Sequence, residues 1–133
     1  QLNKIIENLE IVQQIDNISH EKIRELIDFS YGSPGRYLIN LKYWLSISSP
    51  LRQKIEIKLT NQIESLQLAK EITDELNLEQ QLWLIDFQQN VAWIKQKNSN
   101  VVERLEELRK QLAKYVQPRL AWEVALLDMS LIN

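Results

Sequence analysis

Apolar residues recur every three or four positions along most of the chain, and few residues are present that would interrupt a helix. The 133 residues include only 2 glycines and 3 prolines, and 44% of them are hydrophobic. Apolar side chains at this spacing share one face of an α-helix, and Gly and Pro are the residues that helix interiors tolerate least. The sequence therefore predicts an all-α fold.

Helix-capping signals divide this pattern into segments. The first predicted helix covers residues 1 to about 14, and the second begins after Ser19 and runs to about Tyr31. The pattern lapses at SISSP, so we place a domain boundary near residues 46 to 50, with domains at 1–46 and 50–133. Three later helices are each announced by an Asn followed three residues on by Glu or Gln, as in a capping box: Asn61 with Glu64, Asn77 with Gln80, and Asn100 with Glu103.

The composition argues against several classes of protein. The chain has no Cys and a single histidine, His20, whereas zinc and iron sites usually recruit several imidazoles or thiolates. Carboxylates lie on the polar faces of the predicted helices, and no convergent catalytic group or cofactor motif is present. No apolar run is long enough to span a membrane. We expect a non-catalytic cytoplasmic protein without a metal or cofactor, and, because Gln1 already lies within a helical pattern, a piece of a longer chain.

Both glycines lie in one short corner, residues 32 to 35. Gly32 follows the last apolar position of the second helix, where a left-handed residue often ends a helix, while Ser33 and Pro34 are a typical N-cap and first helical residue. Gly35 has no such role, so a close approach by another group is expected there. Together with Arg36 and the free N–H groups of the helix start, Ser33 and Gly35 could form an anion or nucleotide site. The alternative is a sharp corner with a surface arginine.

A basic stretch follows the corner, although the whole chain has 16 basic and 18 acidic residues. If Tyr37, Tyr43 and Trp44 provide stacking surfaces between these bases, the stretch could bind nucleic acid directly. A solvated surface is the simpler interpretation. The bases, against the single acid Glu56, are Arg36, Lys42, Arg52, Lys54 and Lys58.

The last predicted helix, from Pro118, carries two apolar stripes. One consists of Leu120, Val124, Leu127 and Leu131, and the other of Trp122, Ala125, Leu126 and Met129. A small bundle does not easily cover two such stripes, so one of them is expected to meet another chain. The alternative is a central helix of the same bundle.

The motif GSPGRYLINL, taken with the closing QPRLAWEVALL, resembles the C-terminal part of the delta-prime subunit of the bacterial DNA polymerase III clamp loader, in particular its cyanobacterial versions. The resemblance covers the whole chain. It implies that residues 1–46 are helices of the small three-helix lid of an AAA+ module and that residues 50–133 form the helical collar. The implied partners are the tau/gamma and delta subunits in a hetero-pentameric ring that loads the sliding clamp on primed DNA. Contact with DNA would be indirect, and no membrane is implied.

The resemblance also bears on individual residues. ATP-hydrolysing tau/gamma subunits carry a Gly-Ser-x-Arg-Asp-Ala-Leu pattern whose Arg senses nucleotide, and Gly35 stands at that position here, with Arg36 one place later. This departure argues against a phosphate-sensing Arg36 and fits the non-hydrolysing delta-prime subunit, although a tau/gamma-type subunit stays an alternative. For the collar interface, the resemblance favours an aromatic anchor at Trp122 with Leu126 and Met129 beside it.

Overall fold

The structure of the protein is a computed structural model that describes residues 18–59, 61–114 and 117–132. The helix predicted at residues 1 to about 14 lies outside these ranges. All regular secondary structure in them is helical, which confirms the all-α prediction.

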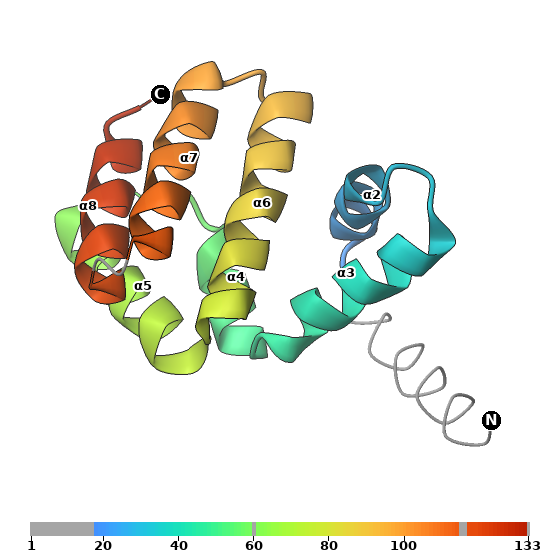
Figure 1. Cartoon of the computed structure of the whole chain (residues 1–133), viewed down its shortest axis with the longest axis horizontal. Helices are drawn as coiled ribbons and strands as arrows, with labels where there is room; N and C mark the ends of the chain where they lie inside the picture. Colours follow the sequence, from blue (N-terminus) through green and yellow to red (C-terminus); the bar gives the residue numbers. More distant parts are fainter. Residues whose placement is uncertain (1–17, 60, 115–116, 133) are drawn as a thin grey trace. The chain divides into compact units, whose positions relative to one another are not determined.

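The chain divides into two compact units, Gln1–Ser46 and Ile47–Asn133. The helices are α2 (His20–Phe29), α3 (Pro34–Ser46), α4 (Ser49–Glu56), α5 (Gln62–Glu75), α6 (Leu78–Ile94), α7 (Ser99–Ala113) and α8 (Pro118–Ser130) (Figure 1).

In the first unit, a side-chain cap begins α2, a left-handed turn ends it, and a proline opens α3. The Ser19 hydroxyl accepts from the Lys22 N–H at 3.1 Å and caps α2. This helix ends at Phe29, two residues before the predicted end, because Tyr31 already turns into the left-handed region with Gly32 (φ 51° and 77°). Pro34 then opens α3 as predicted.

A buried polar contact joins α2 to α3. The Asn40 amide donates to the Ser30 hydroxyl at 3.0 Å, and that hydroxyl donates to the Leu26 carbonyl at 2.7 Å. Lys22, itself largely buried, lies with its ammonium 4.8 Å from the Trp44 ring centroid. Cation–π attraction and hydrogen bonding thus satisfy the polar groups that this helix pair covers. The buried apolar residues of the pair are Leu26, Leu41 and Trp44.

In the second unit, α6, α7 and α8 are successive antiparallel neighbours (Figure 1). Helix α5 packs on α8, and the short α4 packs on α5. Helix α6 has the largest set of buried residues, as its nearly all-round apolar sequence predicts, whereas α7 buries one stripe. The α6 residues are Gln81, Trp83, Leu84, Ile85, Phe87 and Ala92, and the α7 residues are Leu105, Leu108 and Leu112.

Of the three Asn caps predicted for these helices, two are present in the structure and one is not. Asn61 caps α5 by accepting from the Glu64 N–H, and Asn77 and Gln80 form a complete capping box at α6. The predicted Asn100 cap of α7 is wrong. Lys97 turns left-handed (φ 51°) and the Asn98 N–H bonds back to the Ala92 carbonyl at 3.0 Å, so the chain reverses two residues earlier. Asn98 is therefore the cap, and accepts from Val101 at 3.2 Å.

One buried amide connects three elements of this unit. The Gln81 side chain donates to the Leu76 carbonyl at the end of α5 and accepts from the Trp122 indole N–H of α8, both at 2.9 Å. Gln81 and Trp122 are both buried. Because an unpaired polar atom at this depth is costly, the two bonds fix how α5, α6 and α8 meet.

Replacing Trp122 by Phe should lower the free energy of unfolding by about 1–3 kcal/mol, because the Gln81 carbonyl oxygen would stay buried without its donor. Urea unfolding measures the change. A double-mutant cycle with Gln81→Met should give a coupling energy of about 1 kcal/mol. If the two substitutions are simply additive, the bond does not stabilise the fold as described.

Candidate interaction surfaces

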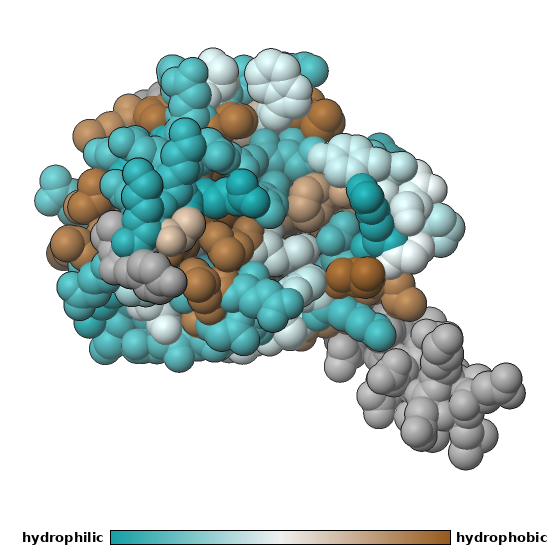
Figure 2. All heavy atoms as spheres, in the orientation of Figure 1, coloured by the Kyte–Doolittle hydropathy of each residue, from teal (hydrophilic) through white to brown (hydrophobic). Residues whose placement is uncertain are grey.

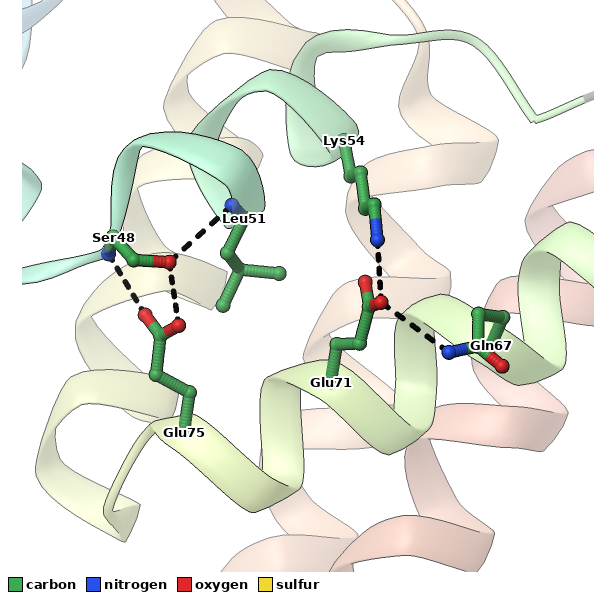
Figure 3. Close-up of polar contacts among 6 residues, drawn as sticks. All are labelled: Ser48, Leu51, Lys54, Gln67, Glu71 and Glu75. Atoms are coloured by element: carbon green, nitrogen blue, oxygen red, sulfur yellow. Dashed lines mark hydrogen bonds and ion pairs between the residues drawn. The ribbon is translucent and has the colours of Figure 1, made fainter.

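Acidic residues of α5 hold α4 in place (Figure 3). The Glu75 carboxylate accepts from the Ser48 N–H at 2.8 Å and from the Ser48 hydroxyl at 2.5 Å, while that hydroxyl caps α4 by accepting from Leu51 at 3.4 Å. One turn earlier on α5, Glu71 binds Lys54 at 2.5 Å and accepts from Gln67 at 3.3 Å. These contacts of Glu71 and Glu75, which we name the α4–α5 seam, therefore anchor the N-terminus and the last turn of α4.

Two carboxyl groups in this unit have shifted pKa values. The hydrogen bond from Lys54 lowers the pKa of Glu71 below its usual value, although burial of the carboxylate acts in the opposite direction. Burial raises the pKa of Asp86, which Arg109 at 3.2 Å only partly offsets, and nearby Glu106 raises it further. Both groups belong to contacts between neighbouring helices, α4 with α5 and α6 with α7, which is a structural role.

The seam changes the interpretation of the basic stretch 36–58. Lys54 is engaged by Glu71, and Trp44 is only 2% exposed, so it cannot stack on a base. The predicted use of Trp44 as a stacking surface is therefore wrong. The bases are also divided between the two units, with Arg36 and Lys42 in the first and the others in the second. Trp44 is therefore excluded as a stacking surface, and direct nucleic-acid binding by the remaining bases with Tyr37 and Tyr43 stays a prediction.

The corner at residues 32–36 is open to solvent. Arg36 and Gly35 are exposed, and the Ser33 hydroxyl accepts from the Arg36 N–H at 3.3 Å. A Cβ added to Gly35 would meet only Ser33 Oγ at 3.9 Å, so the described chain makes no close approach there. The geometry therefore gives Gly35 no steric role within the fold, and the anion site at Ser33, Gly35 and Arg36 stays a prediction.

Helix α8 presents the opposite stripe to the one we expected. Trp122 is 3% exposed, Leu126 is also buried and Met129 is partly covered, because the Gln81 bond turns the indole into the core. Trp122 and Leu126 are therefore core residues and not available anchors, which corrects the predicted interface. The exposed stripe consists of Leu120, Val124 and Leu131, with exposed fractions of 52%, 42% and 81%. Figure 2 shows apolar surface atoms along the edge of the view where α5 and α8 lie.

Ion pairs hold α8 against its neighbour. The Arg104 side chain of α7, mostly covered, binds Asp128 of α8 at 2.8 Å and Glu107 at 3.3 Å. Since Arg104 and Trp122 fix the helix from two sides, its exposed apolar stripe is displayed on a fixed scaffold.

In residues 18–59, 61–114 and 117–132, no group of three His, Cys, Asp or Glu side chains is placed to hold a metal ion. No helix within these ranges has the length and apolarity needed to cross a bilayer.

The described residues thus define an all-α protein that exposes some large apolar side chains on its helices. A family model described as "Cyanobacterial DNA polymerase III delta prime, C-terminal domain" matches residues 2–129. The chain belongs to this family, and the resemblance seen in GSPGRYLINL and QPRLAWEVALL is confirmed. Comparisons with curated proteins and with solved structures gave no significant match.

Replacing Gly35 by Ala should raise the free energy of unfolding by about 0.5–1 kcal/mol, since Ala is the better helix former and its methyl group would make only an ordinary contact with Ser33 Oγ at 3.9 Å. Gly32→Ala is the matched control and should be destabilising, because Gly32 has φ +77°. Thermal or urea unfolding measures both. Destabilisation by Gly35→Ala would show that another part of the chain does approach this residue.

The Lys54–Glu71 pair should make stability depend on acid pH. Because the folded-state pKa of Glu71 is lowered, the pair stabilises the protein above the usual carboxyl pKa, and this contribution is lost as the pH falls through the folded-state pKa. At pH 7 the free energy of unfolding of the wild type should exceed that of Glu71→Gln by a few tenths to about 1 kcal/mol, which is the usual contribution of a partly exposed ion pair. This difference should shrink below about pH 4.5.

Urea unfolding from pH 2.5 to 7 measures this difference. In a Lys54→Gln background, Glu71→Gln should have a much smaller pH-dependent effect. If Glu71→Gln had the same pH-dependent effect in that background as in wild type, Lys54 would be ruled out as the cause of the lowered Glu71 pKa.

Proposed function

We propose that the chain is a non-catalytic scaffold part of a clamp-loader subunit, which helps to assemble the ring that loads the sliding clamp on primed DNA in the cytoplasm. Membership of the delta-prime C-terminal family supports this role. In this proposal residues 1–46 are lid helices of an AAA+ module, and residues 50–133 are the collar domain. The chain would need no cofactor of its own, and DNA would be contacted by other parts of the ring.

The observation that carries the proposal is the exposed apolar stripe of α8, formed by Leu120, Val124 and Leu131. Exposed apolar side chains on an already well-packed helix favour contact with another protein, because contact removes them from water without reorganising the core. We propose this stripe, in place of Trp122 and Leu126, as the contact with a neighbouring tau/gamma or delta subunit.

The stripe has features that suit an assembly surface. Its helix is held by the Gln81–Trp122 bond and by the Arg104–Asp128 pair, so little conformational freedom would be lost on docking. Arg119 and Glu123 lie on the same helix, with Arg119 Nε 3.9 Å from Glu123 Oε2. These charged side chains can form part of a polar rim around the stripe.

Substituting Leu120 and Val124 together by Gln should raise the dissociation constant for the purified tau/gamma and delta subunits at least tenfold, because interface apolar contacts are lost. Folding should be little changed, since both residues are exposed and Gln is at least as good a helix former as Val. Sedimentation velocity with labelled protein measures assembly, and thermal unfolding checks the fold.

Ile57→Gln is the matched control, because Ile57 is a 63% exposed apolar residue outside α8. It should leave assembly unchanged. Assembly of the Leu120/Val124 variant with wild-type affinity would refute the stripe as the interface, and failure of wild-type protein to associate with these subunits would refute the scaffold proposal.

A further inference from the structure

The link between the two units is very short. Only Ile47 and Ser48 lie between the end of α3 and the start of α4, and the two units divide directly before Ile47. The side chain of Ile47 is buried, with 1% of its surface exposed. A link of two residues has few backbone dihedral angles that can change, so the state of Ile47 and Ser48 decides how freely the units can turn relative to each other.

Ser48 is held by three hydrogen bonds. Its hydroxyl accepts from the Leu51 N–H at 3.4 Å, which caps α4, and its backbone has φ −61° and ψ 149°. The two oxygens of the Glu75 carboxylate accept from the Ser48 N–H at 2.8 Å and from the Ser48 hydroxyl at 2.5 Å (Figure 3). We name these last two bonds the Glu75–Ser48 bridge. Both donors of Ser48 are therefore engaged by a single side chain.

The position of Glu75 is unfavourable for its own helix. The last turn of α5 contains Asp74 and Glu75 and no basic residue, so negative charge lies at the negative end of that helix dipole. Helix α4 has the opposite need, because its first turn contains no acid. The Glu75 carboxylate supplies a negative charge there, at the positive end of the α4 dipole. Its favourable contribution is therefore made at the start of α4 and not within α5.

The Glu75–Ser48 bridge is attached to the core of the second unit. Leu76, the residue after Glu75, is buried, and its carbonyl accepts from the Gln81 amide at 2.9 Å. Gln81 in turn accepts from the Trp122 indole of α8. Because Glu75 directly precedes this fixed carbonyl, the bridge ties the link to a well-anchored helix end.

We propose that Glu75 is a positioning residue that confines the pivot between the two units to Ile47. With the Glu75–Ser48 bridge formed, the dihedral angles of Ser48 are set and rotation within the link is left to Ile47. Without it, Ser48 keeps only its longer cap bond, and the units can adopt more orientations. Both units belong to one chain, so this inference does not rest on the proposed ring assembly and can fail independently of it.

The neighbouring ion pair provides a matched control. Lys54 lies in the last turn of α4, so its pair with Glu71 holds the end of that helix farther from the link. Glu71 and Glu75 are one turn apart on α5. Removing either carboxylate takes one contact from the α4–α5 seam, but only the loss of Glu75 releases Ser48.

Double electron–electron resonance between two spin labels measures the freedom of the link. The chain has no Cys, so the exposed residues Arg24 of α2 and Lys110 of α7 can be replaced by labelled Cys. In this labelled protein Glu75→Ala should widen the distance distribution about twofold, because Ser48 gains rotational freedom. Glu71→Ala should leave the width unchanged. Glu75→Gln should widen it less than Glu75→Ala, since the amide oxygen still accepts from the Ser48 N–H.

A second pair of labels, at the exposed residues Gln62 and Lys110, lies within the second unit and should give the same distribution in every variant. This pair shows that the unit stays folded, as the exposure of Glu75 leads us to expect. An unchanged width for Glu75→Ala with the labels at positions 24 and 110 would overturn the proposal. Equal widening by Glu71→Ala would also overturn it, because the effect would then come from a general loosening of α4.

Discussion

The buried amide of Gln81 is the contact on which the arrangement of the second unit depends. Helix α8 has enough apolar circumference to pack in two ways, and burial of hydrophobic area alone does not choose between them. The indole N–H of Trp122 does choose, because it needs an acceptor when buried and finds one in Gln81 at 2.9 Å. Directional bonding therefore decides which stripe of α8 becomes core and which faces solvent.

Local sequence signals predicted most of the fold. The all-α class followed from the apolar spacing, and the caps at Ser19, Asn61 and Asn77 followed from short-range patterns that need only the next three residues. The two compact units divide at Ser46 and Ile47, while the domain bounds 1–46 and 50–133 stay a prediction. Such features are predictable because the interactions that create them are close in sequence.

The errors in the sequence-based interpretation arose where a partner is distant. Gln81 lies 41 residues from Trp122, so nothing near α8 in the sequence shows that its tryptophan has a buried acceptor. Likewise, the basic stretch looked uncompensated because the acid that engages Lys54 is Glu71, on the next helix.

The seam between α4 and α5 has a consequence for the order in which the chain becomes structured. Helix α4 has 8 residues, too few for a helix to persist alone in water, and the groups that hold Ser48 and Lys54 come from Glu75 and Glu71. During synthesis the ribosome releases α4 before these acids exist as folded neighbours. This segment must therefore wait, largely unstructured, until the following helix has emerged from the exit tunnel.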